Sequence, residues 1–292
     1  MRGPFVGIDV GENFLDFAIV DSPPRALGFK RVELDGLKQP VCDTLAERIK
    51  DAAPVLDAGA TVLVDSPRWP RDLDWSRGCV GREPPPRGRE IDAELQRIFP
   101  RLMAAPDGTA YKPGLSMFPT PRYAYFAQWA RDSRLKPHLS AIAKELFREL
   151  LDGEACGLEP VGGGTFTRFM LAGFATYRAL ERLGVSAFES YPDLQLRLSS
   201  PSTALAPKKR RVEALAARRR IVASLAAGFG LRDTPAPANL DQADAAVLAL
   251  AAAASARSGT LWVVSNPCEG SFMLALDEQQ ARSLTESGIA LA

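Results

Sequence analysis

The stretch GIDVGENFLDFAIVD, residues 7 to 21, holds two apolar runs that each end on an aspartate and that flank a glycine-bearing turn. Residues 4–9 and 14–20 fit two strands joined by this turn, and the alternating residues 27–34 fit a third strand. The pattern therefore predicts an antiparallel meander. An ionised side chain without a partner is costly inside a strand, so Asp9 either caps a turn or belongs to a site.

Composition narrows the chemistry that this chain can perform. With 292 residues, 46% of them apolar, the chain is large enough for a sizeable core, and 36 basic against 35 acidic residues give a net charge of only +1. One histidine and four scattered cysteines argue against His-based triads, multi-histidine metal sites and a disulfide framework. Any catalytic chemistry is therefore expected to rest on carboxylates.

The rest of the chain reads as an α/β protein. Residues 40–53 have helical spacing and lead into a short apolar run at 60–65, which is typical of a buried strand reached by a helical crossover. A long loop-rich insertion, 66–136, follows this fourth strand and encloses one short helix. Further helices are expected at 138–151, 168–183, 208–229 and 240–256, a strand at 185–189, and a closing strand pair in TLWVVS and FMLAL.

These elements predict a single domain over residues 1–292. The N-terminus has no apolar leader with a small-residue cleavage site, and no apolar run is long enough to cross a membrane outside Ala-rich helices. We therefore expect a cytoplasmic protein without a membrane partner. The sequence does not fix the oligomeric state.

Several acids stand where the predicted strands and the last helix meet solvent. Asp9, Asp65 and Glu189 end or nearly end three strands, while Asp241 and Asp244 share one face at the start of an Ala-rich helix. Because the carboxyl ends of strands in such sheets lie together, we expect these acids to converge. Converging carboxylates need cations, and hard oxygen ligands suit Mg²⁺ or Mn²⁺.

Each acid also has a structural explanation. Asp9 and Asp65 are each followed by turn-like sequence, where aspartate is common. Glu189 has many arginines available as salt-bridge partners, and Asp241 fits a helix N-cap with Asp244 supporting the helix dipole. The interpretation as a site rests on the series of acids rather than on any single one.

The order of motifs is similar to that of a known family. GIDVGENFLDFAIVD, VLVDSPRW, GREIDAEL, SMFPTP, FESYPDL, PKKRR…ARRR, DQADAAVLALAAA and NPCEGSFMLAL resemble, in this order and over nearly the whole chain, the DUF429 family of predicted ribonuclease H-like nucleases. The resemblance implies a mixed five-stranded sheet with helices on both faces. It also implies that Asp9, Asp65 and the Asp241/Asp244 pair hold the metals, with Glu189 as an additional family acid.

The resemblance extends to one more element and includes two departures. Arg89 and Asp92 fit the Arg-x-x-Asp element of the family, although Ile91 stands where a cysteine is usual. The first turn carries Glu12-Asn13 in place of the common small residues. These departures leave the metal positions intact, but they concern residues that would influence substrate preference.

The expected activity is hydrolysis of a phosphodiester by a two-metal mechanism. Nucleic acid is the expected partner. A basic helix is a candidate for contacts with the phosphate backbone, or is a solvated face; its charges are Lys208, Lys209, Arg210, Arg211, Arg218, Arg219 and Arg220. Trp69, Trp75 and the aromatics of 118–125 either stack on bases or pack under prolines.

Two other function classes stay open at this point. Actin-like ATPases and sugar kinases also begin with an acid-and-glycine hairpin, but they need a second phosphate-binding hairpin, and no clear one follows residue 150. A nucleic-acid-binding module without cleavage activity would bind independently of Asp9. A nuclease would lose turnover and keep binding in Asp9→Asn.

Overall fold

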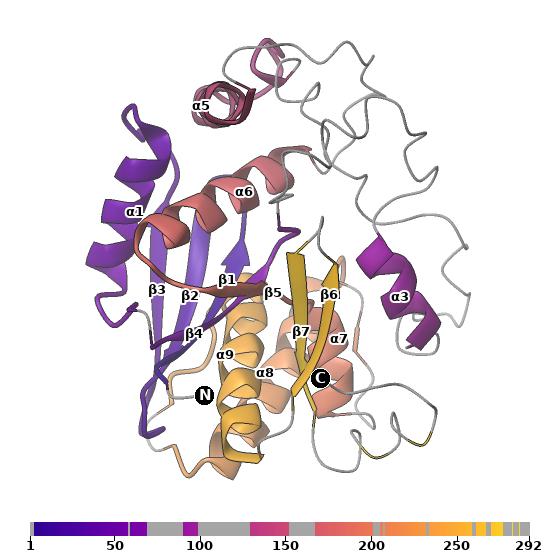
Figure 1. Ribbon diagram of the computed structural model, residues 1–292. Coiled ribbons are helices and arrows are strands. Elements are labelled where there is room, and N and C mark those ends of the chain that lie inside the picture. The colour runs from indigo at the N-terminus through magenta and orange to yellow at the C-terminus, as the bar shows by residue number, and fades with distance from the viewer. Residues whose placement is uncertain are drawn as a thin grey trace.

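A computed structural model describes residues 3–57, 59–68, 90–98, 129–151, 167–200, 205–206, 208–231, 234–258, 261–266 and 270–276, with residues 282 and 286. Its centre is a seven-stranded sheet in the order β3-β2-β1-β4-β5-β7-β6 (Figure 1). In chain order the strands are β1 (Phe5–Val10), β2 (Phe14–Val20), β3 (Leu27–Glu33), β4 (Thr61–Asp65), β5 (Ala187–Glu189), β6 (Leu261–Asn266) and β7 (Gly270–Ala275).

The strand directions confirm the predicted meander and the mixed α/β class. β1, β2 and β3 are antiparallel neighbours, whereas β4 is parallel to β1, β5 to β4 and β7 to β5. The sheet has seven strands, not the five that the family resemblance implied. The difference arises because the predicted closing pair, β6 and β7, joins the same sheet through the pairing of Phe272 with Glu189.

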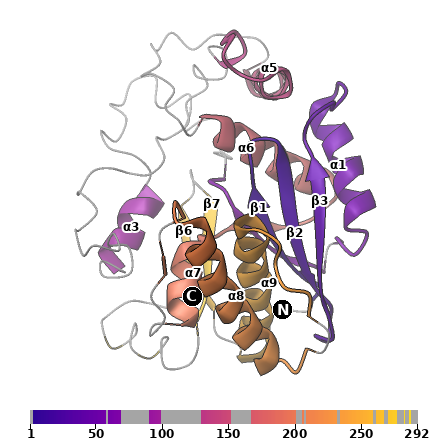
Figure 2. The ribbon, with the colours of Figure 1, turned by 180° about the vertical axis from the view of Figure 1, so that it is seen from behind.

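Helices cover both faces of the sheet. They are α1 (Val41–Ala52), α3 (Glu90–Ile98), α5 (Pro137–Leu151), α6 (Thr167–Arg182), α7 (Pro192–Ser199), α8 (Arg211–Gly228) and α9 (Leu240–Ser258). α1 and α6 lie on one face and α8 and α9 on the other, as the two opposite views show (Figures 1 and 2). All of these helices except α7 were predicted from the sequence. None of the helices in the described part of the chain is long and apolar enough to span a membrane.

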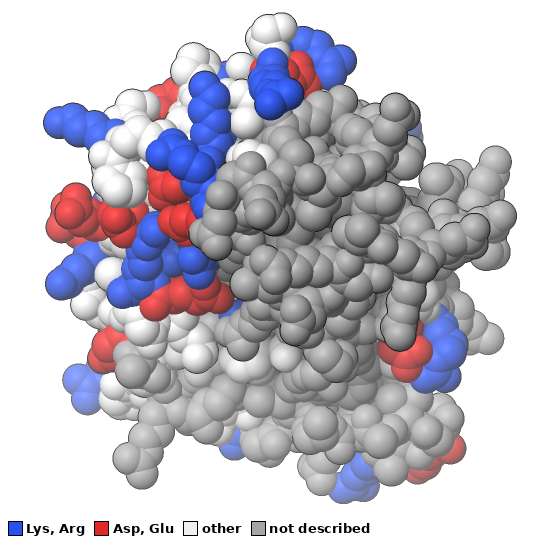
Figure 3. Space-filling view, turned by 45° about the horizontal axis from the view of Figure 1, so that its top comes forward, with Lys and Arg blue, Asp and Glu red and all other residues white. Residues whose placement is uncertain are grey.

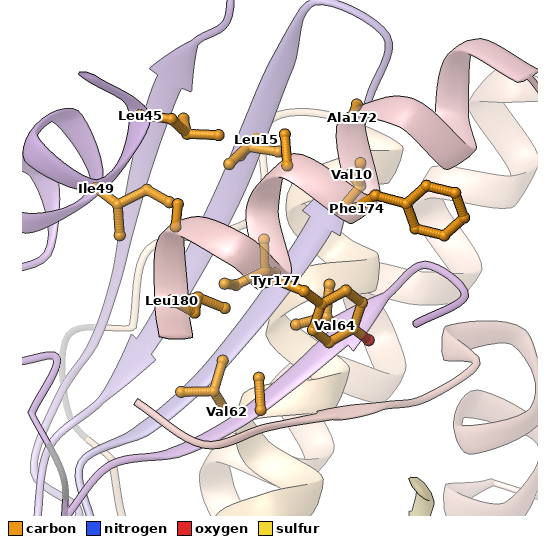
Figure 4. Packing of buried hydrophobic residues seen from close by; sticks show 14 of the residues in the cluster. Val10, Leu15, Leu45, Ile49, Val62, Val64, Ala172, Phe174, Tyr177 and Leu180 are labelled. Carbon is orange, nitrogen blue, oxygen red and sulfur yellow. The ribbon is translucent and has the colours of Figure 1, made fainter. Parts of the chain in front are cut away.

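The face under α1 and α6 holds the larger apolar cluster. Alternate strand residues such as Val10, Leu15 and Val64 point into it and meet Leu45 of α1 and Phe174 of α6 (Figure 4). All five of these side chains are buried. This alternation, one residue in two along each strand, leaves the other set of side chains to face α9.

α9 packs unusually close to β1, and the sequence makes this approach feasible. A Cβ atom at Gly7 would lie only 2.0 Å from the carbonyl oxygen of Ala245, so only glycine fits under this turn of the helix. Alanines on the facing side of α9, among them Ala249 and Ala252, pack with Phe5 and Leu63 of the sheet. The first turns of α9 are thereby held beside the carboxyl end of β1.

The insertion predicted at 66–136 is only partly within the described residues. Its expected short helix is confirmed as α3, and residues 129–136 lead into α5. Trp69, Trp75 and the aromatics of 118–125, considered for base stacking, lie outside the described residues, as does Arg89. The single domain over residues 1–292 stays a prediction.

Candidate functional site

Asp9 and Asp65 are direct neighbours at the carboxyl ends of β1 and β4. They are paired in the parallel register of the two strands, so both side chains point to the α9 face of the sheet. Asp9 is 5% exposed. On the other neighbouring strand, β2, Asp16 is paired with Asp9. Asp16 is buried, and Arg31 donates to its Oδ1 from Nε at 2.8 Å and to its Oδ2 from Nη2 at 2.5 Å. The sheet itself therefore brings together the two acids that were predicted to meet.

α9 supplies two more acids to the same place. Asn239 caps the helix, because its Oδ1 accepts a hydrogen bond from the Gln242 amide at 2.7 Å. Asp241 is thus not the N-cap, and its side chain lines the pocket described below. Asp244, one turn further, is fully buried, and its charge raises the pKa of Asp9.

Asp244 is held by two cations of the chain. Lys208 Nζ lies 2.8 Å from its Oδ2, and Arg218 Nε donates to its Oδ1 at 2.7 Å. The Arg218 side chain is 1% exposed and also donates to Asp193 at the start of α7. Arg218, which the sequence placed among the basic residues of a possible phosphate-binding face, is therefore an internal counter-ion, because it donates to the buried Asp244 of α9 and to Asp193 of α7.

The electrostatics of the acid pair reflect crowding and burial. Burial raises the pKa of Asp9 well above its ordinary value of 3.8, and the charges of Asp65 and Asp244 raise it further. Burial also raises the pKa of Asp65 to about 7, although Lys208 opposes this shift. A hydrogen bond joins the two carboxyl groups. Such a pair holds a proton that isolated aspartates lose in mild acid.

The acids open onto a cavity of about 510 Å³. Its floor is acidic, its wall is aromatic, and the half-exposed side chains of Lys208 (50%) and Asp193 (54%) stand at its edge. The lining residues are Asp9, Val10, Gly11, Phe14, Asp65, Phe169, Tyr191, Pro192, Asp193, Lys208 and Asp241. Asp244 lies beneath this surface and Glu189 is not part of it.

Glu189 does not join the other acids. It pairs with Val64, the neighbour of Asp65 along β4, and so shares the opposite face of the sheet with α6. Its side chain is fully buried and accepts a hydrogen bond from the Arg68 amide at 3.1 Å. In this structure Glu189 therefore fixes the chain just after it leaves β4, three residues beyond Asp65, instead of facing the cavity.

The remaining predicted residues have different surroundings. Lys209 is exposed next to Lys208, and Arg219 is exposed on α8, where its Nε donates to the Pro237 carbonyl at 2.7 Å. Asp92 belongs to α3, and its side chain, like all of Arg89, lies outside the described part of the molecule. Neither residue of the Arg-x-x-Asp element is thus tested.

The part of the chain that the structure describes contains no preformed metal-binding constellation. Among the described residues, no three His, Cys, Asp or Glu side chains stand where they could hold a metal ion together. The physical reason is visible at Asp244, whose two oxygens face Lys208 and Arg218. The carboxyl groups that remain at the cavity are the pair Asp9 and Asp65, together with Asp241.

Sequence reasoning missed part of this site. Asp193 and the lining aromatics Phe169 and Tyr191 were not proposed as site residues, nor was Asp16. Tyr191-Pro192-Asp193 follows β5 after a single residue, Ser190, and a proline with an acid after it signals a helix start. That signal would have placed α7 at the carboxyl edge of the sheet.

Comparisons of the chain with models of protein families, with curated proteins and with solved structures find no match. The likeness to the DUF429 family therefore rests on the quoted motifs alone. The fold and the geometry of the site carry the functional argument.

Proposed function

We propose that this chain is a ribonuclease H-like, metal-dependent hydrolase that cleaves phosphodiester bonds in nucleic acid. One observation carries the proposal: Asp9 and Asp65 stand side by side on the central strands, with Asp241 and Asp244 brought to them by a helix that packs on β1. The order β3-β2-β1-β4-β5, with an antiparallel meander and then two parallel strands, supports the ribonuclease H-like assignment. β7 and β6 extend this core at one edge.

The donor chemistry fits a hard divalent cation at the acid pair. Mg²⁺ often binds proteins through one or two carboxylates and completes its shell with water and substrate phosphate, so a third protein ligand is not required. Asp9 and Asp65 would hold this ion, and its positive charge would offset the burial and the repulsion from Asp244 that raise both pKa values. Bound there, Mg²⁺ or Mn²⁺ would activate water and stabilise charge on the phosphoryl group.

A second ion, as in a two-metal mechanism, would compete with Lys208 for Asp244. The Lys208 side chain is half-exposed and long, so it can leave Asp244 for solvent or for a phosphate oxygen, whereas Arg218 is enclosed. Lys208→Gln is therefore expected to bind Mn²⁺ more tightly than the wild type. Arg218 would continue to orient Asp244.

The reaction itself is a balanced hydrolysis. The oxygen of water forms a bond to phosphorus, the ester bond to the leaving oxygen breaks, and the leaving oxygen gains a proton. The products are a phosphate monoester and a hydroxyl end. Asp9, Asp65 and Asp241, which all line the cavity, would orient the reacting groups from one side.

An exposed basic segment beside the cavity supports a polyanionic substrate. Lys209, Arg210 and Arg211 are exposed at the start of α8, adjacent to Lys208 at the cavity edge. On the face seen in Figure 3, Lys and Arg side chains of the described residues are interleaved with Asp and Glu. We therefore expect backbone contacts at this segment, with a moderate dependence of affinity on salt.

The test compares wild type, Asp9→Asn and Asp21→Asn on labelled single-stranded, duplex, hybrid and junction nucleic acids, with Mg²⁺, Mn²⁺ or EDTA. Asp21 is exposed at the far end of β2 and is a matched control for the loss of one carboxylate. We expect cleavage that requires metal, survives in Asp21→Asn and is lost in Asp9→Asn. Binding without cleavage, equal in all three proteins, would refute hydrolysis and favour a binding module.

A further inference from the structure

The cavity combines two kinds of surface that suit two parts of one ligand. Asp9 and Asp65 form its acidic floor, while Phe14, Phe169 and Tyr191 contribute aromatic rings to its wall. Its volume of about 510 Å³ falls within the range of small-ligand sites, about 300 to 1,000 Å³. Three aromatic side chains are more than cation binding at the floor requires.

Two of the aromatic rings are fixed by their surroundings. The Gly11 amide donates to the Phe14 carbonyl at 2.8 Å, and the Arg31 guanidinium carbon lies 3.8 Å from the centroid of the Phe14 ring. Tyr191 packs edge-to-face on Phe272, with 5.0 Å between centroids and 65° between planes. A wall ordered before binding loses little conformational entropy when a planar ligand packs on it.

The wall comes from three separate elements that meet at the acids. Phe14 begins β2, Phe169 lies in the first turn of α6, and Tyr191 directly precedes α7. Phe14 and Phe169 are half-buried, so part of each ring is accessible, whereas Tyr191 is almost covered. Phe14 and Phe169 are therefore the rings that a ligand would meet.

We propose that the cavity takes an unpaired nucleotide, with its base against Phe14 and Phe169 and its phosphodiester over Asp9 and Asp65. This inference rests on the proposed function and names its substrate class. In a duplex the bases are stacked inside the helix, so a base enters such a cavity only after it leaves the stack. A single strand meets no such cost, and stacking on aromatic rings accepts every base.

The consequence is a preference for single-stranded nucleic acid with little sequence specificity. A free mononucleotide carries the same base and phosphate chemistry, but it lacks the neighbouring phosphates that Lys209 and Arg210 would contact. The single strand is therefore the expected source of the nucleotide. Competition between a single strand and a free mononucleotide shows which of the two the cavity prefers.

The experiment measures binding of a labelled single-stranded oligonucleotide to the full chain carrying Asp9→Asn, in Mg²⁺, so that the phosphodiester does not meet two bare carboxylates and no cleavage interferes. An abasic sugar is placed at each position in turn, and the matching duplex and a mononucleotide serve as further probes. Since stacking on an aromatic side chain is worth about 1 to 3 kcal/mol per base, one abasic position should weaken binding about 5-fold to 150-fold. The duplex should bind more weakly than the single strand.

Phe169→Leu provides a structural control on the same measurement. Leucine retains apolar packing but removes the ring, so single-strand binding should weaken and the effect of the abasic position should shrink. Phe29→Leu is the matched variant, because Phe29 is also half-buried and packs against the apolar cluster under α9, but it does not line the cavity. Both Phe variants are made in the Asp9→Asn chain. Phe29→Leu should bind like Asp9→Asn alone, and thermal unfolding verifies that both variants fold.

The outcomes separate this inference from the proposed hydrolysis. Equal binding of all abasic probes, a duplex bound as tightly as the single strand, or no oligonucleotide binding would overturn the base cavity. A mononucleotide that competes as well as the single strand would show that the cavity binds free nucleotides, and it would overturn the single strand as the ligand. Abasic-sensitive binding without cleavage by the wild type in Mg²⁺ or Mn²⁺ would instead retain the cavity and refute hydrolysis.

Discussion

Replacing one member of the buried acid pair should stabilise the fold. Burial raises the pKa of Asp65 from its ordinary value of 3.8 to about 7, so above neutral pH the folded chain keeps an ionised carboxyl group in an unfavourable place. Because each tenfold change in proton affinity is worth about 1.4 kcal/mol, the largest penalty is about 4 kcal/mol. Asp65→Asn removes this penalty but buries an amide, at a cost of about 2 kcal/mol. The net gain expected for the variant near pH 8 is about 2 kcal/mol.

The sign of the pH dependence follows from the direction of the shift. Below about pH 4 the carboxyl group is protonated in the folded and in the unfolded chain, and the penalty is absent. Between about pH 4 and pH 7 the folded chain retains a proton that the unfolded chain has lost, so wild-type stability falls as pH rises. The variant lacks this contribution. Its advantage should therefore grow from acid to neutral pH and then level off.

Urea unfolding of the wild type and Asp65→Asn across this pH range, in EDTA, measures the difference directly. Asp21→Asn, at an exposed position, should follow the wild type. Added Mg²⁺ should stabilise the wild type by about 2.7 kcal/mol at a hundredfold excess over its dissociation constant and leave Asp65→Asn unchanged. If the free energy of unfolding changed with pH in parallel for the wild type and Asp65→Asn, the reasoning about the acid pair would be refuted.

Two further variants test how the site is built. Gly7→Ala should destabilise the fold by about 3 kcal/mol, because the new Cβ would meet the Ala245 carbonyl oxygen. Gly28→Ala is the control and should have little effect, because a Cβ at Gly28 would have no atom within 4 Å. Equal urea midpoints for the two variants would contradict the close packing of α9 on β1. Arg218→Met should lower stability by about 3 kcal/mol because it leaves the buried Asp244 with Lys208 as its one remaining cationic partner among the described residues. Adding Asp244→Asn should recover most of that loss, and thermal unfolding that shows the two losses simply adding would argue against the pair.

Local sequence patterns were sufficient for most of the elements. The meander, the helix before β4 and the Ala-rich α9 were predicted within a few residues of their observed bounds, because the periodicity of apolar residues reports which side of an element is buried. α7 was missed, since a helix of only eight residues gives little periodicity. The convergence of Asp9 and Asp65 was also predictable, because both stand at carboxyl ends of neighbouring strands.

What the sequence by itself determined is therefore the set of strands and helices and the two acids that end the central strands. Only the tertiary structure decided which face of the sheet each acid occupies and which charges it meets. Glu189 is paired with Val64, and since side chains alternate along a strand, a shift of one residue in this register would have turned it toward Asp65. Arg218 stands in a run of similar arginines, but it alone of that run is enclosed by Asp193 and Asp244, because long-range packing of α8 on α7 and α9 selects it.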